Sequence, residues 1–202
     1  MKSGLGVWLS LRWYPILLEM YCAGIAAVAA RRYDSLASLF YTRMPGLEGN
    51  KEQYFVESVT DAIIEWNRAN IFKRIPGHDR YFTPQSEYLF KRLQPSLDDT
   101  LFLGKSYESA FDEFEILLAL VVADIEKQKG SGHWSVWGSI GRFGWKHRKL
   151  DSAGPFAALL QSARSEGENW APLEAGLFGG SSERALEVAT GVAETVSKLN
   201  WY

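Results

Sequence analysis

Apolar residues recur three and four positions apart along most of the chain, which predicts a protein built from helices. Between residues 14 and 30, Leu17, Tyr21, Ile25 and Val28 fall on one helical face. Four alanines, Ala23, Ala26, Ala27 and Ala30, keep the other sides of this helix small, and small side chains let a neighbouring helix approach closely. We therefore expect the helix over 14–30 to be a central one.

The longest predicted helix runs from Ser106 to about Lys127 and ends at the glycines of residues 130–132. Its apolar positions, which we expect to be buried, are Tyr107, Phe111, Phe114, Leu118, Val121, Val122 and Ile125. Apolar stripes also predict helices over about 155–165 and from residue 182 to the end of the chain, and one that buries Phe55, Val59, Ile63 and Trp66.

Residues typical of helix N-termini precede the other predicted helices: Asp34, Asn50 with Gln53 three positions later, Thr83 with Pro84, and Ser181 or Ser182. A break is predicted at Gln94-Pro95. No run of alternating β-branched residues and no Asn-Gly turn indicates a hairpin. The sequence thus predicts an all-α fold, a single helical domain over 1–202 with about six to eight helices and a long irregular loop at 130–150.

Composition narrows the class of protein. The 202 residues include 22 Lys and Arg against 24 Asp and Glu, a net charge of −2, with 47% hydrophobic and 14% aromatic residues. This excludes a disordered chain, and also a protein that is basic throughout. The only cysteine, Cys22, has no partner for an internal disulfide, so we expect a cytoplasmic protein.

The apolar N-terminal segment is too short to cross a membrane. Its longest uncharged run, Met20 to Ala30, has eleven residues, whereas a spanning helix needs about 20. A signal peptide is the alternative, since Lys2 precedes the apolar stretch and Ala27-Val28-Ala29 is similar to a cleavage site. Because Arg12 and Glu19 fall where such a peptide is uncharged, we expect a buried helix and no membrane association.

No motif in the chain predicts catalysis, a metal site or a cofactor. Gly104-Lys105-Ser106 is similar to the end of a phosphate-binding loop, but Asp99 stands where that loop needs glycine, so we expect an ordinary turn. Histidines at 78, 133 and 147 have no spacing typical of zinc ligands. An enzyme that uses them as bases assembled from distant positions stays open as an alternative.

Two predicted helices carry stripes of carboxylates beside or opposite their apolar faces. One stripe comprises Glu57, Asp61 and Glu65, and the other comprises Glu108, Asp112 and Glu115. A di-metal site in a helical bundle would add Glu-x-x-His pairs, which both stripes lack. We therefore expect both stripes to face water.

Basic and aromatic residues alternate in the loop at 130–150, which contains four Lys and Arg and no acid. We predict partner contacts for Trp134, Trp137, Arg142, Phe143, Trp145, Lys146, Arg148 and Lys149. One alternative is that the tryptophans pack onto the helices and the cations pair with the acidic helix 108–126. Another is nucleic-acid binding, with phosphates held by cations and bases stacked on aromatic rings, shared with a second basic-aromatic segment at 66–92.

Several apolar motifs resemble a helical region of uncharacterised bacterial multidomain proteins. The motifs are Tyr14-Pro15-Ile16-Leu17-Leu18, Tyr21, residues 24–29, Phe111, Phe114-Glu115, residues 117–120, Gly141-Arg142-Phe143-Gly144-Trp145 and residues 176–180. In those proteins, of the type found in defence against phage, the region follows a sirtuin-like or ATPase-like module. The resemblance implies an accessory, sensing or oligomerising part and assigns no catalytic residue. The 202 residues contain no such module, so we expect an excised domain or a stand-alone relative.

Together these observations predict a cytoplasmic, non-catalytic helical domain for interaction, sensing or scaffolding in a bacterial, anti-phage setting. The expected partner is a protein or an upstream enzymatic module, and self-association is an open alternative. The second hypothesis is a nucleic-acid-binding protein that uses segments 66–92 and 130–149.

Overall fold

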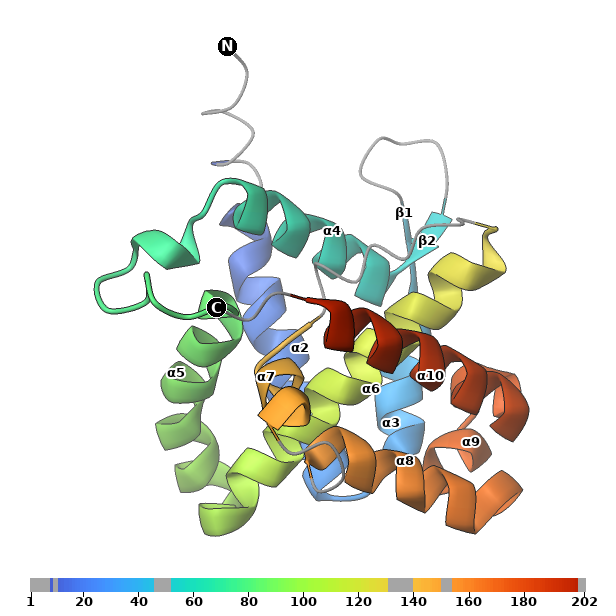
Figure 1. Ribbon diagram of the computed structural model, residues 1–202. Helices are drawn as coiled ribbons and strands as arrows, with labels where there is room; N and C mark the ends of the chain where they lie inside the picture. The colour runs from blue at the N-terminus through green and yellow to red at the C-terminus, as the bar shows by residue number, and fades with distance from the viewer. Residues whose placement is uncertain (1–7, 9–10, 46–51, 131–139, 150–153, 200–202) are drawn as a thin grey trace.

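The fold is all-α, as predicted. The structure, a computed structural model, describes residues 8, 11–45, 52–130, 140–149 and 154–199, except for the side chains of 147–149. Nine α-helices lie in this part of the chain: α2 Tyr14–Ala29, α3 Tyr33–Tyr41, α4 Phe55–Arg68, α5 Pro84–Leu101, α6 Tyr107–Gln128, α7 Phe143–Lys149, α8 Pro155–Glu166, α9 Ala171–Glu174 and α10 Ser182–Lys198. Short 3-10 turns, among them η2 Phe72–Arg74 and η3 Gly104–Ser106, connect some of them (Figure 1).

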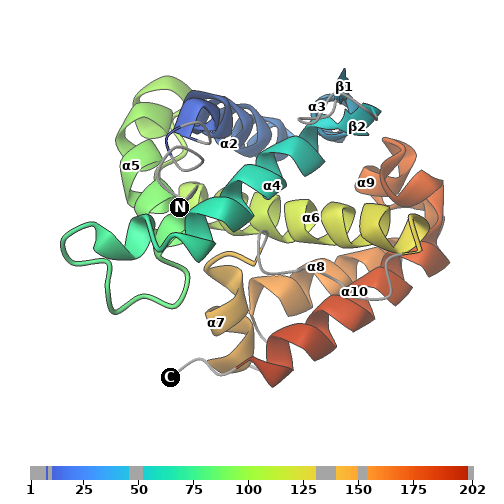
Figure 2. The same ribbon diagram turned by 90° about the horizontal axis from the view of Figure 1, so that it is seen from above.

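Helix α6 is the axis of the molecule. Seen from above, α2 and α5 lie on one side of α6, and α7, α8 and α10 lie on the other (Figure 2). Sixteen of its residues are buried, from Tyr107 to Ile125, which is the pattern of a helix surrounded by others. All seven positions predicted to be buried in this helix are buried.

Helix α2 packs against α6 at close range. The predicted face of α2, which includes Leu17 and Ile25, is buried. A methyl group added at Gly24 would lie 2.0 Å from the ring of Phe114, so the small residue is what admits that ring. The expected close approach is confirmed, although α6 and not α2 occupies the centre. Among the described residues, no helix has both the length and the apolarity needed to cross a membrane.

Three elements differ from the sequence predictions. A two-stranded antiparallel hairpin, β1 Arg43–Pro45 and β2 Glu52–Tyr54, precedes α4. Helix α5 continues through Pro95 to Leu101 instead of breaking there. The segment predicted to be irregular contains α7, which packs against α8 and α10 as well as α6. Tertiary contacts stabilise these elements, whereas the sequence patterns report only local preference.

The helix starts are partly as predicted. Thr83 precedes α5 with Pro84 in the first turn, and the Ser181 hydroxyl accepts the backbone N–H of Arg184 at 3.3 Å at the start of α10. Helix α4 instead begins after Tyr54, whose backbone N–H donates to Glu57 at 2.9 Å. The predicted cap, Asn50, lies outside the described residues, and Gln53 belongs to β2.

Candidate functional site

A cluster of carboxylates lies inside the protein where α5, α6 and α7 meet. Asp112 and Glu115 of α6 are 3% and 1% exposed, and Glu87 of α5 is 7% exposed. The prediction that the stripe on α6 faces water is therefore wrong for Asp112 and Glu115, because α5 and α7 cover that side of the helix. On α4 the prediction is confirmed for Asp61 and Glu65, which are exposed, whereas Glu57 is half-buried.

Glu115 accepts three hydrogen bonds from three different parts of the chain. The Tyr21 hydroxyl of α2 donates to one carboxyl oxygen at 3.0 Å. The Ser86 hydroxyl of α5 donates to the other oxygen at 2.8 Å, and the backbone N–H of Arg142 reaches that same oxygen at 3.1 Å. Burial raises the pKa of Glu115 to about 8, against the opposing effect of these donors.

Gly141 makes this arrangement possible. A methyl group added at position 141 would lie 1.9 Å from a Glu115 carboxyl oxygen, well inside van der Waals contact. The chain therefore approaches Glu115 closely enough for the next residue, Arg142, to donate its N–H both to Glu115 and to the Ser86 hydroxyl at 2.8 Å. Glu115 thus fixes the position at which α7 begins.

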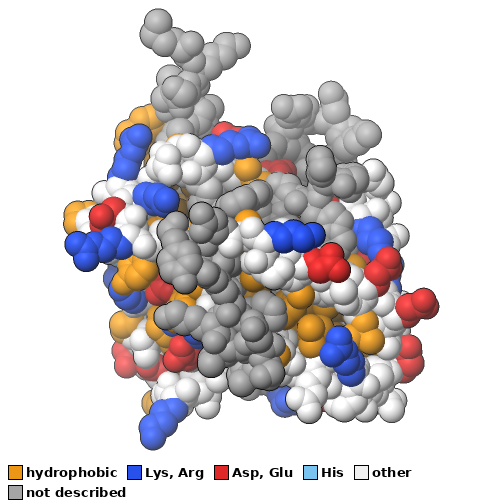
Figure 3. All heavy atoms as spheres, in the orientation of Figure 1, with side chains coloured by type: hydrophobic (Ala, Val, Ile, Leu, Met, Phe, Trp, Pro, Cys, Tyr) orange, Lys and Arg blue, Asp and Glu red, His pale blue; other side chains and the backbone are white. Residues whose placement is uncertain are grey.

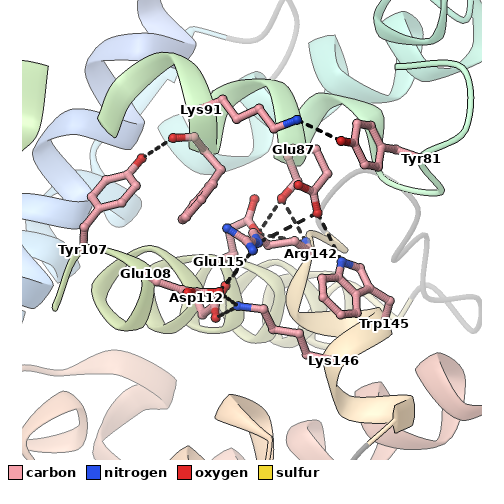
Figure 4. Close-up of polar contacts among 12 residues, drawn as sticks. Tyr81, Glu87, Lys91, Tyr107, Glu108, Asp112, Glu115, Arg142, Trp145 and Lys146 are labelled. Carbon is pink, nitrogen blue, oxygen red and sulfur yellow. Dashed lines mark hydrogen bonds and ion pairs between the residues drawn. The ribbon is translucent and has the colours of Figure 1, made fainter. Parts of the chain in front are cut away.

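The side chains of Arg142 and Lys146 extend toward the remaining carboxylates (Figure 4). Arg142 Nη2 donates to Glu108 at 3.1 Å, and the guanidinium lies 3.5 Å from the centre of the Phe90 ring. Lys146 donates to Glu108 at 2.7 Å and also to Asp112. We call the polar residues that hold Arg142, Trp145 and Lys146, together with these three, the α7 clamp. The others are Ser86, Glu87, Glu108, Asp112 and Glu115.

The pairing within the α7 clamp is incomplete. Arg142 Nε lies 3.8 Å from Asp112 Oδ1 and 3.9 Å from Glu87, which is close enough for attraction but too far for a hydrogen bond. Within the described part of the chain, Arg142 Nε and Nη1 and Asp112 Oδ1 are buried without a hydrogen-bond partner. Burial also raises the pKa of Asp112, although Lys146 and Arg142 act against that shift. The clamp therefore combines hydrogen bonds of ordinary length with attraction between charges that are too far apart to form one.

Glu115 also lines a cavity of about 290 Å³. Aromatic side chains of several elements form part of its wall, namely Tyr21, Trp66, Phe72 and Phe82. The first residues of α5 and the segment just before α7 complete it, including Thr83, Gln85, Ser86, Ile140 and Gly141. The two basic-aromatic segments that the sequence singled out, 66–92 and 130–149, therefore meet at this cavity.

The residues predicted to contact a partner are in different environments. Arg142 and Phe143 are buried, so neither side chain lies at the surface, and partner contacts for them stay a prediction. Trp145 and Lys146 are half-buried, and Trp145 donates its ring N–H to Glu87 at 3.2 Å. The alternative of internal pairing with the acidic helix describes Arg142 and Lys146. Trp134 and Trp137, and the side chains of Arg148 and Lys149, lie outside the described residues.

The other candidate chemistry is dispersed. A ring nitrogen of His78 lies 3.2 Å from the carbonyl oxygen of Pro76, in the loop before α5. The side chains of the other two histidines lie outside the described residues. Gly104-Lys105-Ser106 forms the 3-10 turn η3. Burial raises the pKa of the half-buried Cys22 thiol. Among the described residues, no three or more His, Cys, Asp or Glu side chains are grouped so that they could hold a metal ion.

The site residues that the sequence did not reveal are Tyr21, Ser86 and Thr83, together with the burial of Asp112 and Glu115. Each of them depends on contacts between helices far apart in the chain. The pattern of apolar residues around this helix shows that it is largely enclosed by others, but it does not show whether its acidic stripe faces water or a neighbouring helix. Comparison with models of protein families, with curated proteins and with solved structures found no match.

Proposed function

We propose that this chain is a non-catalytic sensing and interaction domain, in which a small ligand bound in the cavity acts on the α7 clamp. One observation carries the proposal: Glu115 belongs to both. Its carboxyl group lines the cavity and also accepts the N–H of Arg142 at the start of α7. This agrees with the accessory role that the sequence resemblance implies.

The coupling follows from the bonds of Glu115. A ligand that hydrogen-bonds to the carboxyl group, or changes its charge, changes the strength of its bonds with Tyr21, Ser86 and Arg142. Arg142 carries the effect to Glu108 on the surface side of the clamp, since Glu108 is 54% exposed. A protein partner that contacts α7 and this side of α6 would then respond to occupancy of the cavity.

Binding without catalysis is supported by how the polar groups around Glu115 are used. Both hydroxyls near it, of Tyr21 and Ser86, donate their protons to its carboxyl oxygens. A nucleophile needs an adjacent base that accepts its proton and a site for the substrate beside both. Here the candidate nucleophile and base are held by structural bonds that also fix Arg142.

A cavity-blocking variant tests the proposal. Asn67 is an exposed residue at the cavity, and its replacement by tryptophan, Asn67→Trp, is designed to obstruct the opening. Arg68→Trp, one position further and outside the cavity lining, is the matched control. We would screen a fragment library by ligand-observed NMR and then follow amide hydrogen exchange of α7 with each hit.

We expect hits that bind the wild-type protein and Arg68→Trp but not Asn67→Trp, and that change exchange of the Arg142 amide and of α7. Hits that bind equally to both variants would place the ligand elsewhere. Ligands that bind in the cavity and leave exchange of α7 unchanged would contradict the sensing role and leave a plain binding pocket.

A further inference from the structure

The first turn of α5 forms one wall of the cavity. Thr83, Pro84, Gln85 and Ser86 follow one another there, and all four line the cavity and are buried. Proline has no N–H, and the first hydrogen bond of the helix runs from the Glu87 N–H to the Thr83 carbonyl. The N–H groups of Gln85 and Ser86 therefore have no acceptor within the helix, and they carry its positive end.

Thr83 does not accept a hydrogen bond from these N–H groups, although the hydroxyl of a threonine just before a helix usually does. Its side chain makes no capping hydrogen bond. Within the described chain its hydroxyl oxygen is buried without a hydrogen-bond partner, and the residue is only 9% exposed. A buried hydroxyl left unpaired costs free energy unless a bound molecule completes it. Thr83 is one of the residues that line the cavity.

The rest of the cavity adds a cation and flat apolar walls. Lys73 of η2 is exposed and lines the same cavity. The rings of Trp66 and Phe72 stand edge to face with their centres 6.1 Å apart, and Phe82 lies in the same wall. A cavity of about 290 Å³ is many times larger than the roughly 10–15 Å³ that a single water requires, so it has room for a small organic molecule. An aromatic ring with one small substituent is a molecule of this kind.

We propose that the ligand is a small aromatic carboxylate, an inference that rests on the sensing function proposed above. Its carboxylate accepts from the N–H groups of Gln85 and Ser86 and from the Thr83 hydroxyl, near Lys73. Its ring lies against Trp66, Phe72 and Phe82.

Glu115 is compatible with an anionic ligand. Burial raises the pKa of Glu115 to about 8, which favours the neutral acid and so reduces its repulsion of a second carboxylate in the same cavity. The groups that act on its pKa are the Asp112 carboxylate, the Tyr21 and Ser86 hydroxyls and the backbone N–H of Arg142. The ligand thus meets a hydrogen-bonding wall at Glu115 and a positive one at the start of α5.

Three probes separate the parts of this proposal. Benzoate carries ring and charge, benzamide carries the ring without the charge, and acetate carries the charge without the ring. Binding to the whole chain would be measured by NMR titration at pH 7. We expect benzoate to bind at least about tenfold more tightly than either of the others, as a charge-assisted hydrogen bond implies.

Two variants test the residues. Thr83→Val removes the unpaired hydroxyl at nearly constant shape, and Lys73→Ala removes the cation; each is expected to weaken benzoate binding about three- to tenfold. Thr100→Val, at the other end of α5, and Arg74→Ala, the exposed neighbour in η2, are the matched controls and are expected to leave benzoate binding unchanged. Thr83→Val is also expected not to lower the thermal midpoint, because Thr83 makes no cap and its unpaired buried hydroxyl already costs free energy.

The outcomes separate this inference from the proposed function. If benzamide binds as tightly as benzoate and Asn67→Trp blocks both, the cavity remains a ligand site and the anion assignment is overturned. If benzoate binds but none of the three variants Lys73→Ala, Thr83→Val and Asn67→Trp weakens it, the site lies elsewhere. If no aromatic probe binds, the aromatic carboxylate is rejected, while the fragment screen still decides the sensing role.

Discussion

At the scale of single residues, the titration of Glu115 makes the stability of the protein depend on pH. Burial, and then the negative charge of Asp112, raise its pKa to about 8, whereas Tyr21, Ser86 and the Arg142 N–H oppose that shift. In the unfolded chain a glutamate has a pKa of about 4.3. Between these values the folded protein holds a proton that the unfolded chain has released. Stability therefore decreases as pH rises through this window and levels off above about pH 8.

The variant Glu115→Gln tests this linkage. An amide retains an acceptor for Ser86 and Arg142 and cannot ionise, so it imitates the protonated acid. We expect the free energy of unfolding of the wild-type protein to fall by about 3 kcal/mol between pH 5 and pH 8, and Glu115→Gln to remove most of that fall. Urea unfolding at the two pH values measures it. Exposed Glu65→Gln is the control, and an equal loss of slope there would contradict the assignment.

The close approach at Gly141 gives a second prediction at this scale. Gly141→Ala places a methyl group 1.9 Å from Glu115 as the structure stands, so the chain must move and the Arg142 N–H bonds weaken. We expect a loss of about 2–4 kcal/mol in unfolding free energy. The same substitution in a Glu115→Ala background is expected to cost much less. Equal costs in the two backgrounds would show that another contact is responsible.

At the scale of elements, the α7 clamp determines how α7 is held. Lys146→Met removes the cation that pairs with the Asp112 carboxylate, whose side chain is 4% exposed. The other cation near this carboxylate is Arg142, whose Nε lies 3.8 Å away, too far for a hydrogen bond. We expect a loss of about 2–3 kcal/mol at pH 7 because a buried carboxylate is left poorly paired. The loss should be smaller near pH 5, since burial raises the pKa of Asp112 and favours its neutral form.

The control for this prediction is Lys127→Met. Lys127 pairs with Glu187, whose side chain is 64% exposed, so removal of this cation is expected to cost less than about 1 kcal/mol. Denaturant unfolding of both variants at pH 7 gives the comparison. Losses of equal size would mean that the clamp contributes no more than a surface ion pair does.

The elements also show what the sequence could predict. The apolar spacing of α6 and the Thr83-Pro84 start of α5 depend on neighbouring residues, and both are confirmed. The hairpin before α4 was not predicted, because its strands are three residues each and show no alternating pattern. Helix α7 was not predicted, because contacts with helices elsewhere in the chain, among them α6 and α10, help to hold it. The same holds for the site, where Glu115 meets Tyr21 and Ser86 from segments 94 and 29 positions away. An acidic stripe on a helix indicates water or other helices equally, and only packing decides.

At the scale of the whole molecule, charge distribution bears on the nucleic-acid hypothesis. In Figure 3, Lys and Arg side chains of the described residues lie scattered over this face, with acidic side chains between them. Arg142 and Lys146, which the hypothesis assigned to phosphates, are paired with carboxylates of α6. Exposed cations remain in the segment 66–92, among them Lys73, Arg74 and Arg80.

We therefore expect no saturable binding of the chain to labelled single- or double-stranded DNA or RNA, even at about 50 mM salt. Phosphate binding releases counterions and weakens steeply as salt rises, so a comparison at about 50 and 200 mM is diagnostic. Binding that falls by an order of magnitude or more over this range, and that is lost in the triple variant Lys73→Ala, Arg74→Ala, Arg80→Ala, would restore the nucleic-acid hypothesis. It would also reassign Lys73 from a carboxylate in the cavity to a phosphate outside it, because one exposed ammonium group cannot be the main partner of both.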